Sequence, residues 1–165
     1  VVDPVAASQH GDPLLQPDAI DALRELILPL ATLVTPNLGE VRLLTGVDVR
    51  GRADLGEAAR ALHALGPQWV LVKGGHLPDG DAVDLLYDGT TSIELSAPRR
   101  ETAHTHGSGD TLAAAITSGL ARGLDLPAAV ELGKRFITGA VGGSFPLGAG
   151  LGPVGHFWRV RDWPE

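Results

Sequence analysis

The stretch His106-Gly107-Ser108-Gly109-Asp110 decides how this chain is interpreted, because it directly precedes a segment with the apolar spacing of a helix, residues 111–120. Gly107 and Gly109 allow the backbone to bend and to approach a ligand closely. The first N–H groups of a helix have no partners within the helix and lie at its positive end. Such a loop therefore suits an anion, above all a phosphate.

Asp110 needs a separate explanation, because its carboxylate would repel a phosphate bound in this loop. A carboxylate is useful there if it accepts the proton of a hydroxyl group that attacks the phosphate. The loop then predicts a phosphoryl-transfer site. In the alternative interpretation Asp110 only caps the helix, as acidic residues often do. The five residues alone do not decide between the two.

The composition predicts one soluble globular domain, because the chain has 165 residues, of which 44% are hydrophobic and 20% are charged. The net charge of −7 argues against a nucleic-acid partner. The absence of cysteine excludes disulfides, thiolate metal sites and cysteine-based catalysis. No apolar segment is long enough for a membrane span and no signal peptide is visible, so we expect a cytoplasmic protein.

The chain begins with Val-Val-Asp-Pro-Val at 1–5, which predicts a short β-strand followed by a turn. A strand at the very start, in a chain without any methionine, predicts the C-terminal part of a longer protein. An unusual but complete domain is the alternative.

Predicted strands and helices alternate along the chain. Apolar spacing, with proline or glycine near the ends, predicts helices at about 17–28, 38–44, 53–65, 109–122 and 127–141. The first of these has Ile20, Leu23, Leu26 and Ile27 on one face. Strands are predicted at 31–35, 69–73, 82–87 and 92–95, with a hairpin at Asp88-Gly89. This order predicts a parallel sheet between helices, with a late antiparallel excursion.

Polar residues follow the predicted strands, at the edge where α/β folds bind ligands. Asp3 ends the first strand, Asn37 and Glu40 follow the second, and Lys73 ends the third. Asp3 and Glu40 offer oxygen ligands for Mg²⁺, partly through water, and Lys73 offers a positive charge for nucleotide phosphates. Taken singly, Asp3 could stabilise a turn, Glu40 could be a solvated helix residue and Lys73 a surface charge. Their joint placement with the anion loop favours a site.

Six motifs resemble the hydroxymethylpyrimidine/phosphomethylpyrimidine kinases of thiamine biosynthesis. They run in the family's order over almost the whole chain: Val-Val-Asp-Pro-Val at 1–5, Gly-Asp-Pro-Leu-Leu at 11–15, Thr-Pro-Asn-Leu-Gly-Glu at 35–40, Val-Lys-Gly-Gly-His-Leu at 72–77, Thr-His-Gly-Ser-Gly at 105–109 and Gly-Pro-Val-Gly-His-Phe at 152–157. The first and last are more specific than the loop, which the wider ribokinase-like superfamily shares.

The resemblance implies a three-layer α/β/α ribokinase-like fold with a mainly parallel sheet, truncated at its N-terminus, as one kinase domain over residues 1–165. It implies ATP-dependent phosphorylation of 4-amino-5-hydroxymethyl-2-methylpyrimidine and then of its monophosphate, and it favours a homodimer. Gly107, Ser108 and Gly109 would form the anion hole.

By the same resemblance, Asn37 and Glu40 supply an N-x-x-E motif near Mg²⁺, and Asp3 and Lys73 lie beside the ATP phosphates. The helix over 127–141 would wall the adenine pocket. One departure concerns the alcohol substrate: the family usually has cysteine where this chain has Asp110, as ribokinases and many pyridoxal kinases do. Pyridoxal, or a dual specificity, therefore stays open.

The second departure is that family members carry roughly a hundred further residues before the part that matches, including much of the pyrimidine pocket. The activity of the isolated segment is therefore open, and a noncatalytic nucleotide-binding fragment is the alternative.

The histidines and tryptophans have simpler interpretations. His104 and His106 lack a third ligand at convincing spacing for zinc and are predicted to have loop roles. His76 follows Lys73 closely and is either a polar group near the site or part of a turn. The three tryptophans, Trp69, Trp158 and Trp163, are predicted to serve packing.

Overall fold

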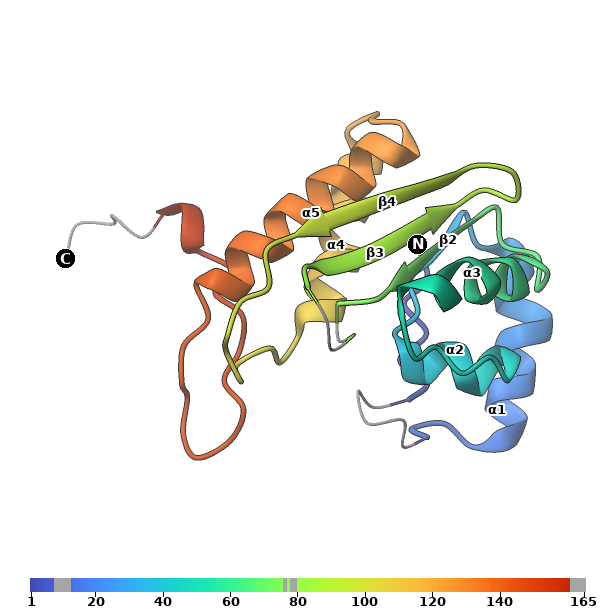
Figure 1. Ribbon diagram of the computed structural model, residues 1–165, viewed down its shortest axis with the longest axis horizontal. Coiled ribbons are helices and arrows are strands. Elements are labelled where there is room, and N and C mark those ends of the chain that lie inside the picture. Colours follow the sequence, from blue (N-terminus) through green and yellow to red (C-terminus); the bar gives the residue numbers. More distant parts are fainter. Residues whose placement is uncertain (8–12, 76, 78–79, 161–165) are drawn as a thin grey trace. The chain divides into compact units, whose positions relative to one another are not determined.

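The computed structural model of the chain describes residues 1–7, 13–75, 77 and 80–160 (Figure 1). The chain divides into two compact units, Val1–Ser96 and Ala97–Glu165. Within the described ranges, no helix is long and apolar enough to cross a membrane.

The first unit is built on a four-stranded sheet in the order β1-β2-β3-β4. Strand β1 (Leu33–Val34) runs parallel to β2 (Trp69–Lys73), and β2 runs antiparallel to β3 (Ala82–Tyr87). Strand β4 (Ser92–Ala97) forms the edge beside β3 (Figure 1). The sheet is therefore mixed, parallel first and antiparallel later, in the predicted order.

The predicted strand at 1–5 is wrong in its extent. Only Val2 pairs, in an isolated parallel bridge with Val34, and its N–H donates to the Leu33 carbonyl at 2.8 Å. Val5 has a positive φ of 45°, which ends any extended run. The start of the chain therefore lies along β1 without forming a strand of its own.

Two helices of the first unit pack on the sheet. The α2 helix (Leu38–Thr45) contacts β2, and α3 (Leu55–His63), preceded by a 3₁₀ turn over Arg52–Asp54, contacts β2 and β3. The residues of α3 that its spacing marks as apolar are buried, and with the centre of β2 they form a core: Leu55, Ala58, Ala59, Leu62, Val70 and Val72. Burying one leucine in this way contributes about 1.5–3 kcal/mol.

The helix predicted over 17–28 is present but changes its winding. It begins as α1 (Pro17–Ala22), continues as a π-helical turn over Leu23–Ile27 and ends as a 3₁₀ turn over Leu28–Leu30. A π turn adds residues to each turn, so the spacing of a regular helix is lost after Leu23. As a result Leu26 and Ile27 are 64% and 45% exposed, whereas Leu28 is fully buried. The predicted apolar face is therefore wrong at Leu26 and Ile27.

The second unit contains two helices packed against each other, α4 (Ser108–Ala121) and α5 (Leu126–Gly142). Their bounds confirm the predicted helices within about a residue. Asp125 caps α5 by accepting the Ala128 N–H at 2.9 Å. The two helices approach closely at Gly133, where a Cβ atom would lie 2.6 Å from Ile116. The chain then leaves α5 in a long loop and returns to a 3₁₀ turn at Trp158–Val160 (Figure 1).

Candidate functional site

In the first unit, Asp3 and Lys73 form a part-buried ion pair. The Lys73 Nζ donates to Asp3 Oδ1 at 2.8 Å, and the Thr35 hydroxyl donates to the same oxygen at 3.1 Å. The Lys73 and Asp3 side chains are only 15% and 13% exposed. Lys73 is therefore not the surface charge that one interpretation allowed. Thr35 has no exposed surface, and its contact with Asp3 was not predicted from the sequence.

Asn37 and Glu40 form a reciprocal cap at the start of α2. The Glu40 N–H donates to Asn37 Oδ1 at 2.9 Å, and the Asn37 N–H donates to Glu40 Oε2 at 2.7 Å. Asn37 also pairs with Lys73 in a parallel bridge. The ends of β1 and β2 therefore bring these residues together, as the sequence predicted.

The same two side chains hold the segment that follows Asp3. The Ala6 N–H donates to Glu40 Oε1 at 3.1 Å, and Asn37 Nδ2 donates to the Ala7 carbonyl at 3.2 Å. Asp3, Asn37, Glu40 and Lys73 are thus one connected group, which we call the strand-end cluster. Figure 1 labels β2, which ends at Lys73, and α2, which contains Glu40.

Glu40 is the buried member of this cluster, with 2% of its surface exposed. Burial raises the pKa of its carboxyl group; the hydrogen bond from the Asn37 N–H and the charge of Lys73 act in the opposite direction, while the charge of Asp3 adds to the rise. The interpretation of Glu40 as a solvated helix residue is therefore wrong.

The cluster offers two carboxylates to a cation. Within the described part of the chain, no group of three or more histidine, aspartate or glutamate side chains is arranged around a metal position. Both oxygens of Glu40 already accept backbone N–H groups, whereas Oδ2 of Asp3 has no partner among the described residues. Such a pair fits Mg²⁺ bound largely through water, because Mg²⁺ prefers oxygen ligands and keeps several waters.

In the second unit, the anion loop leads directly into α4. Gly107 stands at the N-cap with a φ of 77°, and the Thr111 N–H donates to its carbonyl at 3.0 Å. The N–H groups of Gly109 and Asp110 have no acceptor among the described residues. They are the kind of free donors that an anion requires.

No side chain caps α4, so the capping interpretation of Asp110 finds no hydrogen bond to support it. The Asp110 side chain is exposed. Ser108 lies beside it, and its N–H donates to the Thr105 carbonyl at 3.1 Å. The loop therefore presents donors and a carboxylate on the first turn of one helix.

Sequence reasoning missed a contact between this loop and the segment 152–156. Thr111 Oγ1 lies 2.9 Å from His156 Nε2, and His104 Nδ1 accepts the Gly152 N–H at 2.9 Å. The motif at 152–157 was the available signal, but it does not say what its histidine contacts. The loop role predicted for His104 is confirmed. His76, Trp163 and the Gly-Asp pair at 11–12 lie outside the described residues.

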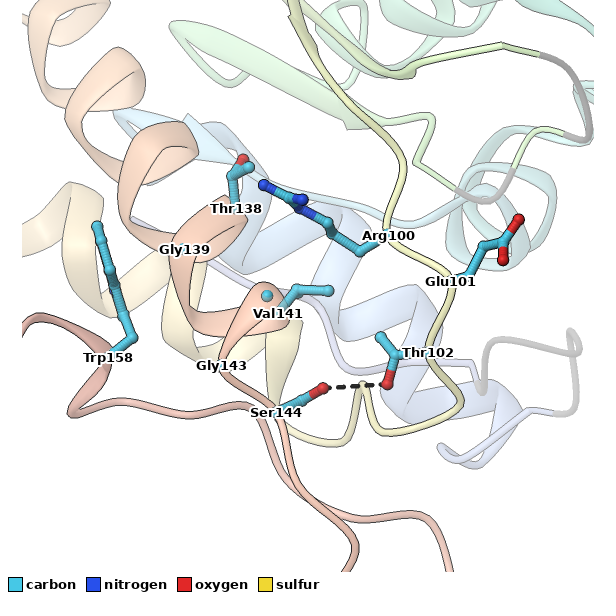
Figure 2. A pocket seen from close by; sticks show the side chains of 10 residues that line it. Arg100, Glu101, Thr102, Thr138, Gly139, Val141, Gly143, Ser144 and Trp158 are labelled. Atoms are coloured by element: carbon cyan, nitrogen blue, oxygen red, sulfur yellow. Dashed lines mark hydrogen bonds between the residues drawn. The ribbon is translucent and has the colours of Figure 1, made fainter. Parts of the chain in front are cut away.

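A pocket of about 560 Å³ lies at the C-terminal end of α5 (Figure 2). Arg100 and Thr138 point towards each other in the pocket (Figure 2). The hydroxyl groups of Thr102 and Ser144 form a hydrogen bond with an oxygen–oxygen distance of 3.0 Å (Figure 2). The lining residues come from the segment before the anion loop, from α5 and from the chain after it: Arg100, Glu101, Thr102, Thr138, Gly139, Val141, Gly142, Gly143, Ser144 and Trp158. Trp158 packs edge-on against Phe136, with ring centroids 6.3 Å apart, which confirms its packing role.

The family described as phosphomethylpyrimidine kinase matches residues 1–155. The chain is 54% identical, over 98% of its length, to a hydroxymethylpyrimidine/phosphomethylpyrimidine kinase of Streptomyces coelicolor, of which it covers 60%. It is 45% identical, again over 98% of its length, to the thiamine biosynthesis bifunctional protein ThiED of Geobacter sulfurreducens, of which it covers 33%.

Among solved structures, the pyridoxal kinase of Staphylococcus aureus in complex with ADP is similar, with a TM-score of 0.90 and 35% identity over 97% of this chain and 58% of that one. This likeness confirms the predicted α/β fold of the ribokinase-like kinases. The chain spans about 60% of the length of the Streptomyces coelicolor relative.

Proposed function

Because the chain belongs to the phosphomethylpyrimidine kinase family, we propose that it is part of an ATP-dependent kinase of thiamine biosynthesis. The proposed reactions transfer a phosphoryl group to 4-amino-5-hydroxymethyl-2-methylpyrimidine and then to its monophosphate. The names of relatives in Streptomyces coelicolor and Geobacter sulfurreducens support this substrate class. The match runs over both compact units, so we assign both to one kinase domain over residues 1–165.

The observation that carries the proposal is the anion loop. Its free N–H groups at Gly109 and Asp110 would stabilise the negative charge of the transferred phosphoryl group. Gly107 supplies the left-handed turn that precedes these groups, and Ser108 completes the loop. Asp110, which is exposed and makes no capping hydrogen bond at the start of α4, would accept the proton of the attacking hydroxyl group.

The strand-end cluster is assigned to ATP and Mg²⁺. Lys73 would neutralise phosphate charge, and Asn37 would hold Glu40 in place. Asp3 and Glu40 would bind Mg²⁺ through water, and the ion would supply charge neutralisation at the phosphates. The ADP complex of the Staphylococcus aureus relative supports a nucleotide ligand. We also assign the pocket at the end of α5 to adenine, because its volume of about 560 Å³ lies within the range of small-molecule sites.

The test is the substitution Asp110→Asn in the full-length gene product. It keeps the size of the side chain but removes the base, so turnover of ATP with hydroxymethylpyrimidine should fall about a hundredfold or more. The matched control is Asp125→Asn at the cap of α5, where asparagine caps as well as aspartate does. Normal turnover by Asp110→Asn would refute the assigned role.

A second candidate substrate is pyridoxal. The carboxylate at Asp110, and the likeness to a pyridoxal kinase at a TM-score of 0.90, support this candidate. Assays with both alcohols separate the two. Phosphorylation of pyridoxal alone would contradict the pyrimidine assignment and leave the role of Asp110 intact.

A noncatalytic nucleotide-binding fragment is the remaining alternative. Binding of MgATP by the 165-residue chain, without phosphoryl transfer by that chain or by the full-length gene product, would favour it. The proposal further includes a homodimer and a cytoplasmic location, where ATP and the small-molecule substrate are available. Light scattering of the purified protein tests the dimer.

A further inference from the structure

We propose that the segment Gly152–His156 is a strap that positions the anion loop, and that His156 acts through Thr111 to hold the first turn of α4. The inference rests on the proposed function, because it assigns a positioning residue to that site. The strap, the anion loop and their contacts all lie within the second unit.

The strap holds the loop on its upstream side through His106. The His106 N–H donates to the Gly152 carbonyl at 3.3 Å, and the His106 carbonyl accepts the Val154 N–H at 3.2 Å. Both backbone groups of the residue before Gly107 are thus engaged by the strap. His104 adds a side-chain contact, since its Nδ1 accepts the Gly152 N–H at 2.9 Å.

The strap holds the loop on its downstream side through Thr111. The Thr111 hydroxyl lies 2.9 Å from His156 Nε2, and the Thr111 side chain is buried, with 7% of the residue exposed. The Thr111 N–H makes the first helical hydrogen bond of α4, to the Gly107 carbonyl. His156 therefore fixes the residue that closes the loop.

The loop from Gly107 to Asp110 makes no side-chain hydrogen bond of its own within the described residues. Two backbone bonds hold the turn itself, from the Ser108 N–H to the Thr105 carbonyl and from the Thr111 N–H to the Gly107 carbonyl. The residues on either side of the loop, His106 and Thr111, both contact the strap.

The strap is itself held against the end of α5. The Gly155 N–H donates to the Ala140 carbonyl at 2.8 Å. A Cβ atom at Gly152 would collide with the Phe145 carbonyl oxygen, and one at Gly155 with the Gly143 carbonyl oxygen. Glycine at these two positions therefore permits the close approach of backbone to backbone. The strap links the end of α5, where the pocket lies, to the anion loop.

The test compares His156→Ala, His156→Gln and Thr111→Val in the full-length gene product. Loss of this one hydrogen bond should lower kcat about five- to tenfold with less than about a twofold change in the KM for ATP. Glutamine can still reach the Thr111 hydroxyl, so His156→Gln should recover most of the rate. The double variant His156→Ala with Thr111→Val should be no slower than either single variant.

Hydrogen exchange gives a readout that does not depend on activity. Exchange at the Thr111 amide should accelerate about tenfold in His156→Ala, while exchange in β2 stays unchanged. The control is His63→Ala in the first unit, where the His63 and Tyr87 ring centroids lie 5.5 Å apart. This variant should leave kcat and the exchange of the Thr111 amide unchanged.

Unchanged Thr111 exchange together with unchanged kcat in His156→Ala would overturn the strap. So would additive losses in the double variant. If the parent protein transfers no phosphoryl group to either alcohol, the proposed function fails, whereas faster Thr111 exchange would still support the strap.

Discussion

Removing the charge of Lys73 should destabilise the first unit by more than loss of a surface ion pair does. Lys73 Nζ and Asp3 Oδ1 are 2.8 Å apart and their side chains are 15% and 13% exposed. At an effective dielectric constant of about 20, two unit charges at this 2.8 Å distance attract by about 6 kcal/mol. Desolvation of both charges offsets most of this attraction.

We therefore expect Lys73→Met to lower the free energy of unfolding by about 2–3 kcal/mol, between the values for exposed and fully buried pairs. The loss arises because the part-buried carboxylate of Asp3 is left without its cationic partner, near the carboxyl group of Glu40. The double variant Lys73→Met with Asp3→Asn removes both charges and should recover about 1–2 kcal/mol relative to the sum of the single variants.

Urea denaturation followed by circular dichroism and tryptophan fluorescence measures these values, with coincident transitions as the test of two-state unfolding. Arg50→Met is the matched control: its pair with Asp48 has a similar distance of 2.9 Å, but the side chains are 84% and 49% exposed. It should cost less than about 1 kcal/mol. Equal losses for Lys73→Met and Arg50→Met, or strictly additive losses in the double variant, would refute the reasoning.

Two further predictions concern Glu40 and Gly107. Burial raises the pKa of the Glu40 carboxyl group in the folded state above its ordinary value of 4.5. The folded chain therefore holds this proton more tightly than the unfolded chain, and the free energy of unfolding falls as the pH rises from about 4.5 through the raised pKa. In urea titrations over this pH range, the Glu40→Gln variant should lose less unfolding free energy than the parent; parallel curves for the two would contradict the assigned cause. Gly107→Ala should lower the free energy of unfolding by about 1–2 kcal/mol, because alanine is strained at a φ of 77° although no atom crowds its Cβ. The control Gly46→Ala, at a φ of 79°, should lower it by the same amount but leave kinase activity intact. Equal activities in the two variants would argue against the anion loop.

The elements that the sequence predicted well are those with a strong local pattern. The β2 strand, from Trp69 to Lys73, matches its predicted bounds because an apolar run between Gly66-Pro67 and Gly74 leaves little choice. The α2 helix ends at Thr45 because Gly46 takes the left-handed conformation that follows a helix. The strand-end cluster followed from the general rule that the carboxyl ends of parallel strands meet at one edge.

The features that could not be predicted depend on contacts between distant residues. The buried carboxylate of Glu40 accepts the Ala6 N–H, which lies 34 residues earlier in the chain. The strap brings His156 to Thr111 across 45 residues, and neither helical nor strand spacing carries that information. The π turn over Leu23–Ile27 is a local feature, but the apolar spacing of a regular α-helix does not indicate it.

The reciprocal cap at Asn37 and Glu40 has a consequence for how lineages of this chain can change. Because these side chains start α2, a descendant without enzymatic activity would still be selected to retain them for folding. Their presence in a sequence is then weak evidence of a working enzyme. The Asp110 side chain makes no such capping contact within the described residues. It would therefore be among the first positions to be substituted once catalysis is no longer selected. If Asp110 is the base proposed above, its retention among descendants of this chain is the more informative sign that they still rely on the reaction.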